Sequence, residues 1–154
     1  MPDFLRVKTF EPQNILRVRP QAAQFGDFPG EITADVGRRL ADHFAITGWV
    51  GNDIIGCCGI AELWTHRAMA WALLSADCSQ HMVPITRLVH QALMLHPANR
   101  IEATVFEDFP AGRRWVEMLG FHCETPSPMR GYDARGRSTW LYAMVKSDLC
   151  SQYH

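Results

Sequence analysis

Apolar and polar positions along this chain follow the two periods that distinguish strands from helices. Apolar and polar residues alternate in 4–10 and again in 101–106, which predicts a strand at each place. The apolar runs 45–50 and 54–63 are separated by turn residues and predict a hairpin. The run 68–74 is apolar without alternation, as expected of a central strand that is covered on both faces.

Two further segments have helical spacing. An apolar residue recurs every fourth position from Ile32 to Phe44, which predicts an amphipathic helix through 35–43. A second helix begins at Pro84 and ends at His96, because Pro97 follows it. The apolar stripe of this second helix comprises Ile85, Leu88, Val89, Ala92 and Leu93.

The segment 100–121 predicts a strand, a turn and a helix in succession. Asp108 and Pro110 mark the start of the helix, because the missing N–H of proline costs nothing in a first turn. Gly120 provides a left-handed stop, and Phe121 can fold back onto the last turn. The expected apolar face of this helix comprises Ala111, Trp115, Met118 and Leu119.

The predicted order is strand, one or two helices, three strands, helix, strand, helix, two strands. The segment 11–19 is a short helix or irregular, 26–30 is a loop, and the last strands fall within 129–145. A strand–helix–strand crossover in the middle requires one parallel pair within an otherwise antiparallel sheet. We therefore expect one α/β (α+β) domain, residues 1–154, with a mixed, mostly antiparallel sheet flanked by about four helices.

Composition narrows the functional classes. Fifteen basic residues nearly balance sixteen acidic ones, so a general nucleic-acid binder is not indicated. No apolar run approaches the roughly 20 residues that span a bilayer, and no secretory segment begins the chain. Five cysteines lack a Cys-x-x-Cys pair, and no histidine pairs with them at zinc spacing. We expect free thiols, no metal, and a cytoplasmic location.

Several motifs together resemble a known family. The Leu119-Gly120-Phe121 helix end after a strand, followed by 129–132 and 140–145, resembles the final unit and closing hairpin of the GCN5-related N-acetyltransferases. More narrowly, 62–64, 70–75, 85–87 and 109–112 are similar to a phage- and prophage-encoded branch of that superfamily. The resemblance covers most of the chain from the second strand onward.

This resemblance implies that acetyl-CoA binds as cosubstrate where the parallel strands 68–75 and 101–106 splay apart. Pantetheine would pair with the first strand, and pyrophosphate would lie at the N-terminus of the next helix, after the loop 76–83. That loop departs from the family because 75–87 contains no glycine and Asp77 adds negative charge. The implied cosubstrate-binding residues are Leu73, Leu74, Ser75, Ser79, Gln80, His81, Met82, Val83, Asp108 and Arg113.

Acetyl transfer to a primary amine needs a base and usually an acid. Glu62, at a strand end, and Glu102, on a central strand, are the candidate bases. The alternative for Glu102 is an ion pair with Arg100 or Arg113, and Glu62 could be a solvated strand end. Val116 occupies the position of the family's acidic tyrosine, so Tyr132, Tyr142 or water would have to substitute.

Two hypotheses follow. The first is an acetyl-CoA-dependent N-acetyltransferase acting on a small-molecule or protein amine by direct attack. The second is a fold relative that does not catalyse and serves as a virion component or binds a host protein, since a fold alone never establishes a reaction. Trp64 and Trp71 either line an acceptor pocket or belong to the core. The hairpin 129–145 could also pair with a second copy in a homodimer.

Overall fold

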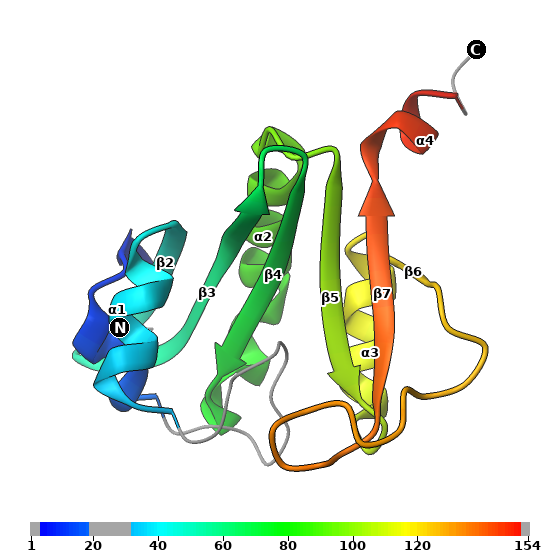
Figure 1. Cartoon of the computed structure of the whole chain (residues 1–154). Coiled ribbons are helices and arrows are strands. Elements are labelled where there is room, and N and C mark those ends of the chain that lie inside the picture. The colour runs from blue at the N-terminus through cyan, green and yellow to red at the C-terminus, as the bar shows by residue number, and fades with distance from the viewer. Residues whose placement is uncertain (1–3, 19–31, 152–154) are drawn as a thin grey trace.

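The computed structural model describes residues 4–18 and 32–151 of the 154-residue chain. Within them, seven strands form one sheet in the order β1-β2-β3-β4-β5-β7-β6 (Figure 1). The strands are β1 (Leu5–Thr9), β2 (Phe44–Val50), β3 (Asp53–Trp64), β4 (Arg67–Leu74), β5 (Arg100–Phe106), β6 (His122–Cys123) and β7 (Thr139–Val145). The helices are α1 (Ala34–Ala41), α2 (Met82–Leu95), α3 (Pro110–Met118) and α4 (Lys146–Ser151), with 3₁₀ helices η1 (Pro12–Leu16) and η2 (Ala76–His81).

The predicted fold class and element order are confirmed. Strands β4 and β5 are parallel, and every other neighbouring pair in the sheet is antiparallel. Helix α2 connects the two parallel strands, as a crossover must. Helices α2 and α3 lie behind the sheet in Figure 1, whereas α1 lies in front of its β1–β3 end. No helix in the described part of the chain is long and apolar enough to cross a membrane.

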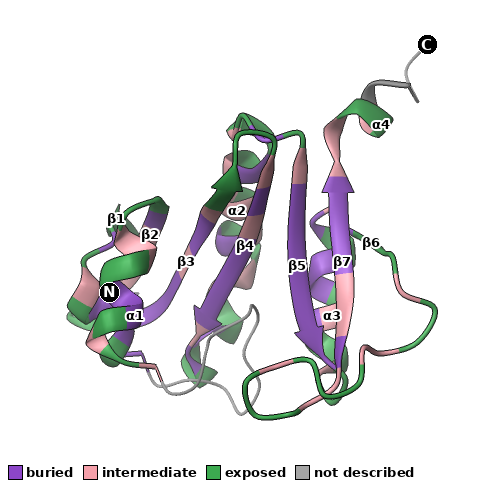
Figure 2. Ribbon diagram, in the orientation of Figure 1, coloured by how far each residue is buried: buried purple, intermediate pink, exposed green. Residues whose placement is uncertain are grey.

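Two apolar clusters, one on each face of the sheet, hold these layers together. The first packs α2 and α3 against the strands and includes Ala70 and Ala72. The second packs α1 and η1 against the other face and includes Trp71 and Leu73. Because successive side chains of a strand point to opposite faces, β4 contributes to both clusters. Figure 2 accordingly shows β4 buried along most of its length, as the unbroken apolar run predicted.

A close approach explains one glycine, and a left-handed backbone conformation explains another. A Cβ at Gly37 would lie 2.3 Å from the Pro12 carbonyl oxygen, so this glycine permits contact between α1 and η1. Gly120 has φ +105° and ends α3, as predicted. Its left-handed conformation is open to glycine at no steric cost. Phe121 follows it and is buried.

Three expectations about local structure are wrong. Phe44 does not continue the α1 stripe but begins β2, and it is exposed. The buried face of α3 is Gly112, Trp115, Val116 and Leu119, so the predicted Ala111 and Met118 face solvent. Helix α3 does begin at Pro110, as predicted, and its N-cap residue Phe109 makes no side-chain cap bond. The predicted loop 76–83 is η2 running directly into α2, which begins two residues before Pro84.

The region after α3 is also simpler than a regular hairpin. The first expected strand is reduced to a bridge between Met129 and Thr139, and β7 pairs with β5 and with the two-residue β6. The long connection 124–138 is organised by Asp133, whose carboxylate accepts hydrogen bonds from the backbone of Arg135 and from Arg137. The predicted loop 26–30 lies outside the described residues.

Candidate functional site

The two parallel strands remain paired over a short distance only. Their register comprises Arg67 with Arg100, Ala68 with Ile101, and Met69 with Glu102. Beyond these pairs, β4 continues to Leu74 beside β3 alone, and β5 continues to Phe106 beside β7 alone. Figure 1 shows the two strands diverging toward their C-terminal ends. We call this opening the fork.

The fork leaves one edge of β4 available to a ligand. Strand backbone groups that lack a neighbouring strand can accept an extended chain as an additional strand. The residues of this edge, from Ala70 onward, are mostly buried, and Leu73 is 1% exposed. Leu73 and Leu74, two of the predicted cosubstrate-binding residues, lie on this part of β4.

At the open end of the fork, β4 is followed by a helix start with few free donors. Ser75 caps η2: its hydroxyl accepts from the Asp77 N–H at 3.2 Å, and its own N–H donates to the Ile55 carbonyl at 2.8 Å. Predicted residues Ser79 and Gln80 are exposed on η2, and His81 is the N-cap of α2 without a side-chain cap bond. Met82 and Val83 begin α2, but Pro84 has no N–H to offer. This end is thus less suited to an anion than a glycine-rich loop.

A polar cleft of about 540 Å³ opens beside η2, on the side of the β2–β3 turn. Its charged and titratable lining consists of Arg17, Asp53, Asp77 and His81. The Arg17 guanidinium donates to the Asn52 carbonyl at 3.1 Å and lies 5.0 Å from the Trp49 ring, so it is held in place. Because two carboxylates face one guanidinium, the cleft is not a simple phosphate receptor.

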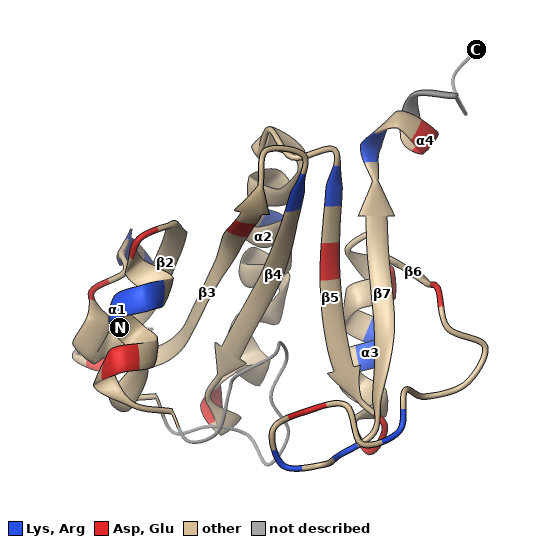
Figure 3. Ribbon diagram, viewed as in Figure 1, with Lys and Arg blue, Asp and Glu red and all other residues tan. Residues whose placement is uncertain are grey.

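A network of charges occupies the closed end of the fork. Glu102 is 3% exposed and forms a bidentate pair with Arg67 through Nε and Nη2, the second bond measuring 3.0 Å. Arg100 lies 3.6 Å from the same carboxylate and binds Glu124 at 2.5 and 3.0 Å. The hydrogen bond to Glu102 raises the pKa of Arg67, and the bond from Arg100 lowers the pKa of Glu124. Figure 3 shows acidic and basic positions at the meeting ends of β4 and β5.

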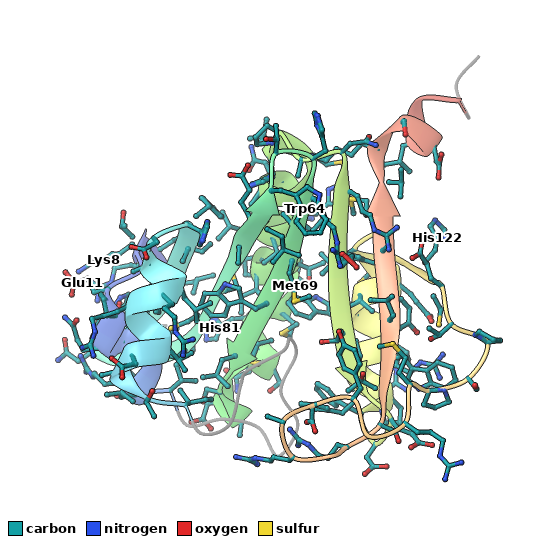
Figure 4. The ribbon with its side chains drawn as sticks, in the orientation of Figure 1. Lys8, Glu11, Trp64, Met69, His81 and His122 are labelled. Atoms are coloured by element: carbon teal, nitrogen blue, oxygen red, sulfur yellow. The ribbon has the colours of Figure 1, made fainter. Side chains whose placement is uncertain are left out.

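Aromatic groups border this network. The Arg67 guanidinium lies 4.6 Å from the Trp64 ring centre, and its charge interacts with the Tyr132 hydroxyl. Trp64 is 58% exposed, so it is not a core residue, whereas Trp71 is buried. Register places Trp64, Arg67 and Met69 on one face, and Figure 4 shows Trp64 and Met69 beside the junction of β4 and β5. The structure therefore brings Glu102 and Tyr132 to one patch.

Glu62 lies apart from this patch. Its side chain is exposed near the end of β3, and its backbone N–H donates to His43 Nδ1 at 3.3 Å. Its charge acts on His96, which ends α2 on the opposite side of the sheet. Burial and then Lys146 lower the pKa of His96, an effect that Glu62 opposes. Two candidate bases therefore face different sides of the sheet.

Arg113 is engaged with β7 rather than with the fork. Arg113 donates to the Tyr142 hydroxyl at 2.8 Å and lies 3.9 Å from the Trp140 ring, both on β7. Burial raises the pKa of Tyr142, whose hydroxyl donates to Glu117 at 2.8 Å. Because β7 is separated from the fork by β5, Tyr142 is engaged with α3 rather than with the fork. Asp108 is exposed in the turn before α3.

A hydrogen bond joins α2 and α3, the two helices that cover one face of the sheet. The Trp115 indole N–H on α3 donates to the Thr86 hydroxyl on α2 at 2.9 Å. The indole also lines an apolar cavity of about 20 Å³ together with Ala70 and Ala72 of β4. That space holds one or two water-sized groups. Val116, at the position of the missing tyrosine, is fully buried beside it.

The described cysteines are unsuited to nucleophilic chemistry. Burial raises the pKa of Cys57 to about 12 against an opposing hydrogen bond from Thr47, and burial with neighbouring Cys57 raises that of Cys58 to about 12. Such thiols are poor nucleophiles at neutral pH. Among the described residues, no three His, Cys, Asp or Glu side chains are grouped to hold a metal ion.

Sequence reasoning missed Arg67, the principal partner of Glu102. The two residues are 35 positions apart, and only the parallel register of β4 and β5 brings them together. Arg100 was anticipated as a partner of Glu102 and is confirmed, whereas Arg113 is not one. The available signal was that Trp64 and Arg67 flank the predicted turn between two strands, where they can pair across it.

Comparison with solved structures identifies the fold. An acetyltransferase of the GNAT family from Bacillus anthracis superposes with a TM-score of 0.65 at 12% identity, over 96% of this chain and 98% of that one. Ard1 from Thermoplasma volcanium gives 0.71 at 11% identity, over 92% and 97% of the two chains. The ribosomal-protein-S18-alanine N-acetyltransferase of Escherichia coli gives 0.68 at 14% identity, over 92% and 94%.

These structures define the class of fold: the chain has the architecture of the GCN5-related N-acetyltransferases over nearly its whole described length. No family model matches the sequence, and no curated protein matches it. The identity to the solved structures is low, so the shared property is the fold.

Proposed function

We propose that this protein is an acetyl-CoA-dependent N-acetyltransferase that transfers acetyl to a primary amine. The observation that carries the proposal is the fork between β4 and β5, in a fold shared with acetyltransferases over more than nine-tenths of both chains. The open edge of β4 fits an extended pantetheine arm, which would pair with the backbone near Leu73 and Leu74. Acetyl-CoA supplies the thioester that is attacked.

The proposed reaction is a direct displacement. The amine nitrogen attacks the thioester carbonyl carbon, a C–N bond forms, and the C–S bond breaks to release the thiolate. One proton leaves the nitrogen for a base or water, and the thiolate takes up a proton from Tyr132 or from water. No covalent acyl-enzyme is proposed, because the described cysteines beside the fork are buried or raised in pKa.

The proposed roles of the acidic residues differ. Glu102 lies at the register position where β4 and β5 separate, next to the point of attack. Its oxygens accept bonds from Arg67 and face Arg100, so we propose that it positions the site and passes a proton only through water. Glu62 is exposed on the other side of the sheet, so we propose it as a base only for a proton that reaches it through water. Glu102→Gln and Glu62→Gln should each reduce turnover while acetyl-CoA still binds.

The proposal is tested by isothermal titration of the purified protein with acetyl-CoA, followed by a screen of amines for thiol release. Micromolar binding supports it, and ligand at 100 times Kd would add about 2.7 kcal/mol to the free energy of unfolding. A titration with CoA lacking acetyl serves as the control for thioester recognition. Absence of heat and of a thermal shift at millimolar ligand would exclude it.

A second candidate function is favoured by one observation, the η2–α2 junction. It contains no glycine, carries Asp77, and places Pro84 in the first turn of α2, so it offers phosphate few donors. We propose, as the alternative, a phage-encoded fold relative that binds a protein partner without catalysis. It predicts no acetyl-CoA binding, which the same titration measures.

A further inference from the structure

The Arg67 side chain has a geometry suited to recognising a second anion. A guanidinium offers two edges, one made by Nε and one Nη, the other made by both Nη groups. Arg67 uses the first edge, because Nε and Nη2 donate to the two oxygens of Glu102. Among the described residues, no group hydrogen-bonds to the second edge, and the side chain is 32% exposed.

This guanidinium is held rigidly. The Glu102 carboxylate binds one edge of the guanidinium, and the Trp64 ring lies against one of its faces, with the ring centre at 4.6 Å. An anion that binds the remaining edge therefore meets donors that are already ordered, and little side-chain entropy is lost on binding. The buried partner, Glu102, is 4% exposed in its side chain, so its negative charge is screened from an approaching ligand by the arginine.

The position of the free guanidinium edge relative to the fork determines how far the carboxylate of a ligand can lie from its reacting amine. Arg67 and Met69 lie on the same face of β4, and Met69 belongs to the last pair before the strands separate. The Arg67 guanidinium reaches the carboxylate of Glu102, the other member of that last pair. A carboxylate bound to Arg67 would thus place an amine on the adjacent carbon near the start of the fork, close to the proposed point of attack.

We propose that the acceptor is a primary amine that carries a carboxylate on an adjacent carbon, as in an α-amino acid, and that Arg67 binds this carboxylate end-on. The acceptor role rests on the proposed function, whereas carboxylate binding by Arg67 does not. Arg100 does not compete for the ligand, because its donors face Glu124 and Glu102. Arg67 is in this proposal the residue that determines acceptor specificity.

Binding of two matched product analogues tests this proposal without any turnover. N-acetyl-L-alanine and N-acetyl-L-alaninamide differ only in the carboxylate, and ligand-observed NMR titration gives both dissociation constants. The wild-type protein should prefer the carboxylate about tenfold or more, the range of a charge-assisted bond. Arg67→Lys should lose most of this preference, because lysine cannot bind two carboxylates through two edges.

Variants at Arg67 also need a safeguard against misfolding. The double variant R67M/E102M removes the carboxylate together with its partner, so no buried charge is left alone. Arg38→Lys on α1 is the matched control, since Arg38 is exposed and pairs only with Asp35 among the described residues. It should keep the full preference.

The outcomes separate the two proposals. Equal binding of both analogues to the wild type, no binding of either at millimolar concentration, or an unchanged preference in both Arg67 variants would overturn the assignment of Arg67. A preference that is lost with Arg67 supports it, even where acetyl-CoA fails to bind. In that last case the acetyltransferase proposal fails and the carboxylate site stands.

Discussion

Glu102 is a charged residue inside a sheet, and its arginine partners are much more exposed to solvent than it is. Its carboxylate is 3% exposed, whereas the Arg67 and Arg100 side chains are 32% and 30% exposed. Removal of the carboxylate leaves two arginines that already reach water, whereas removal of Arg67 leaves the buried carboxylate with Arg100 alone, 3.6 Å away. Loss of a partner from a buried charge is the more costly event.

We expect Arg67→Met to lower the free energy of unfolding by about 3 kcal/mol, at the lower end for a broken buried pair because Arg100 stays 3.6 Å from Glu102. Glu102→Gln should cost less, about 1 kcal/mol, because both arginines reach solvent. Urea unfolding followed by circular dichroism measures both values. Arg38→Met in an exposed pair should change stability by less than about 1 kcal/mol and serves as the control. Equal losses for Arg67→Met and Glu102→Gln would contradict this account.

Residue partners of this kind are the part of the site that the sequence does not reveal. Alternation placed Glu102 on a central strand, and its neighbour Arg100 was an evident partner. The bond to Arg67 depends on strand register, which local pattern does not determine when the strands are joined by a whole helix. The sequence likewise left open whether Trp64 is exposed or part of the core, because exposure at a hairpin end depends on what covers it.

At the scale of elements, periodicity located strands and helices well and their ends less well. A 3₁₀ helix has no long apolar repeat, so η2 could not be distinguished from a loop. The face of α3 was displaced because Gly112, which carries no side chain, packs against Phe109 and sets the contact. A count of apolar positions does not include glycine, so it cannot identify a buried helical face that has a glycine at its centre.

The loop 124–138, which carries Tyr132, depends on the ionised form of Asp133. Burial raises the pKa of this carboxyl. The hydrogen bonds from the Arg137 backbone and side chain, at 2.7 Å each, lower the pKa by more than burial raises it, so the net shift is downward. A carboxyl whose folded pKa lies below its unfolded value stabilises the protein above the unfolded pKa. That contribution is lost as pH falls through the folded pKa.

We therefore expect Asp133→Asn to lower the free energy of unfolding by about 1.5 kcal/mol at pH 7, where the carboxylate bonds are present. The difference between wild type and variant should stay constant down to about pH 4, the ordinary range of aspartate, and shrink below it. Urea titrations at pH 7, 5, 4 and 3 measure it. Asp35→Asn on the surface of α1 is the control, with little effect at any of these pH values. A constant difference down to pH 3 would rule out the ionised form as the cause.

For the whole molecule, element order was sufficient to predict the fold even though identity to the solved structures is 14% or lower in the three compared. Order and period constrain topology, because a parallel pair joined by one helix leaves few arrangements of the remaining strands. The chemistry is not constrained in the same way. The compared structures share the fold, and a shared fold does not determine which residues surround the fork.

The brief pairing of β4 with β5 has a mechanical consequence. It divides the sheet into two half-sheets, β1–β4 and β5–β7, that share three register pairs and the apolar cluster beneath α2 and α3. The polypeptide passes from one half-sheet to the other once in the described chain, at 96–99. Each half-sheet is therefore a contiguous fragment of sequence.

Chains cut between Ala98 and Asn99 should consequently reassemble when they are mixed. Neither fragment should fold alone, because α2 from one and α3 from the other belong to a single apolar cluster that a cut would divide. Co-elution in size-exclusion chromatography and recovery of the circular dichroism of the intact protein would measure reassembly. A cut at Asn52, inside the β2–β3 turn, divides a half-sheet and is the control, with poorer recovery. Such complementing halves would make the molecule a reporter that is assembled by proximity.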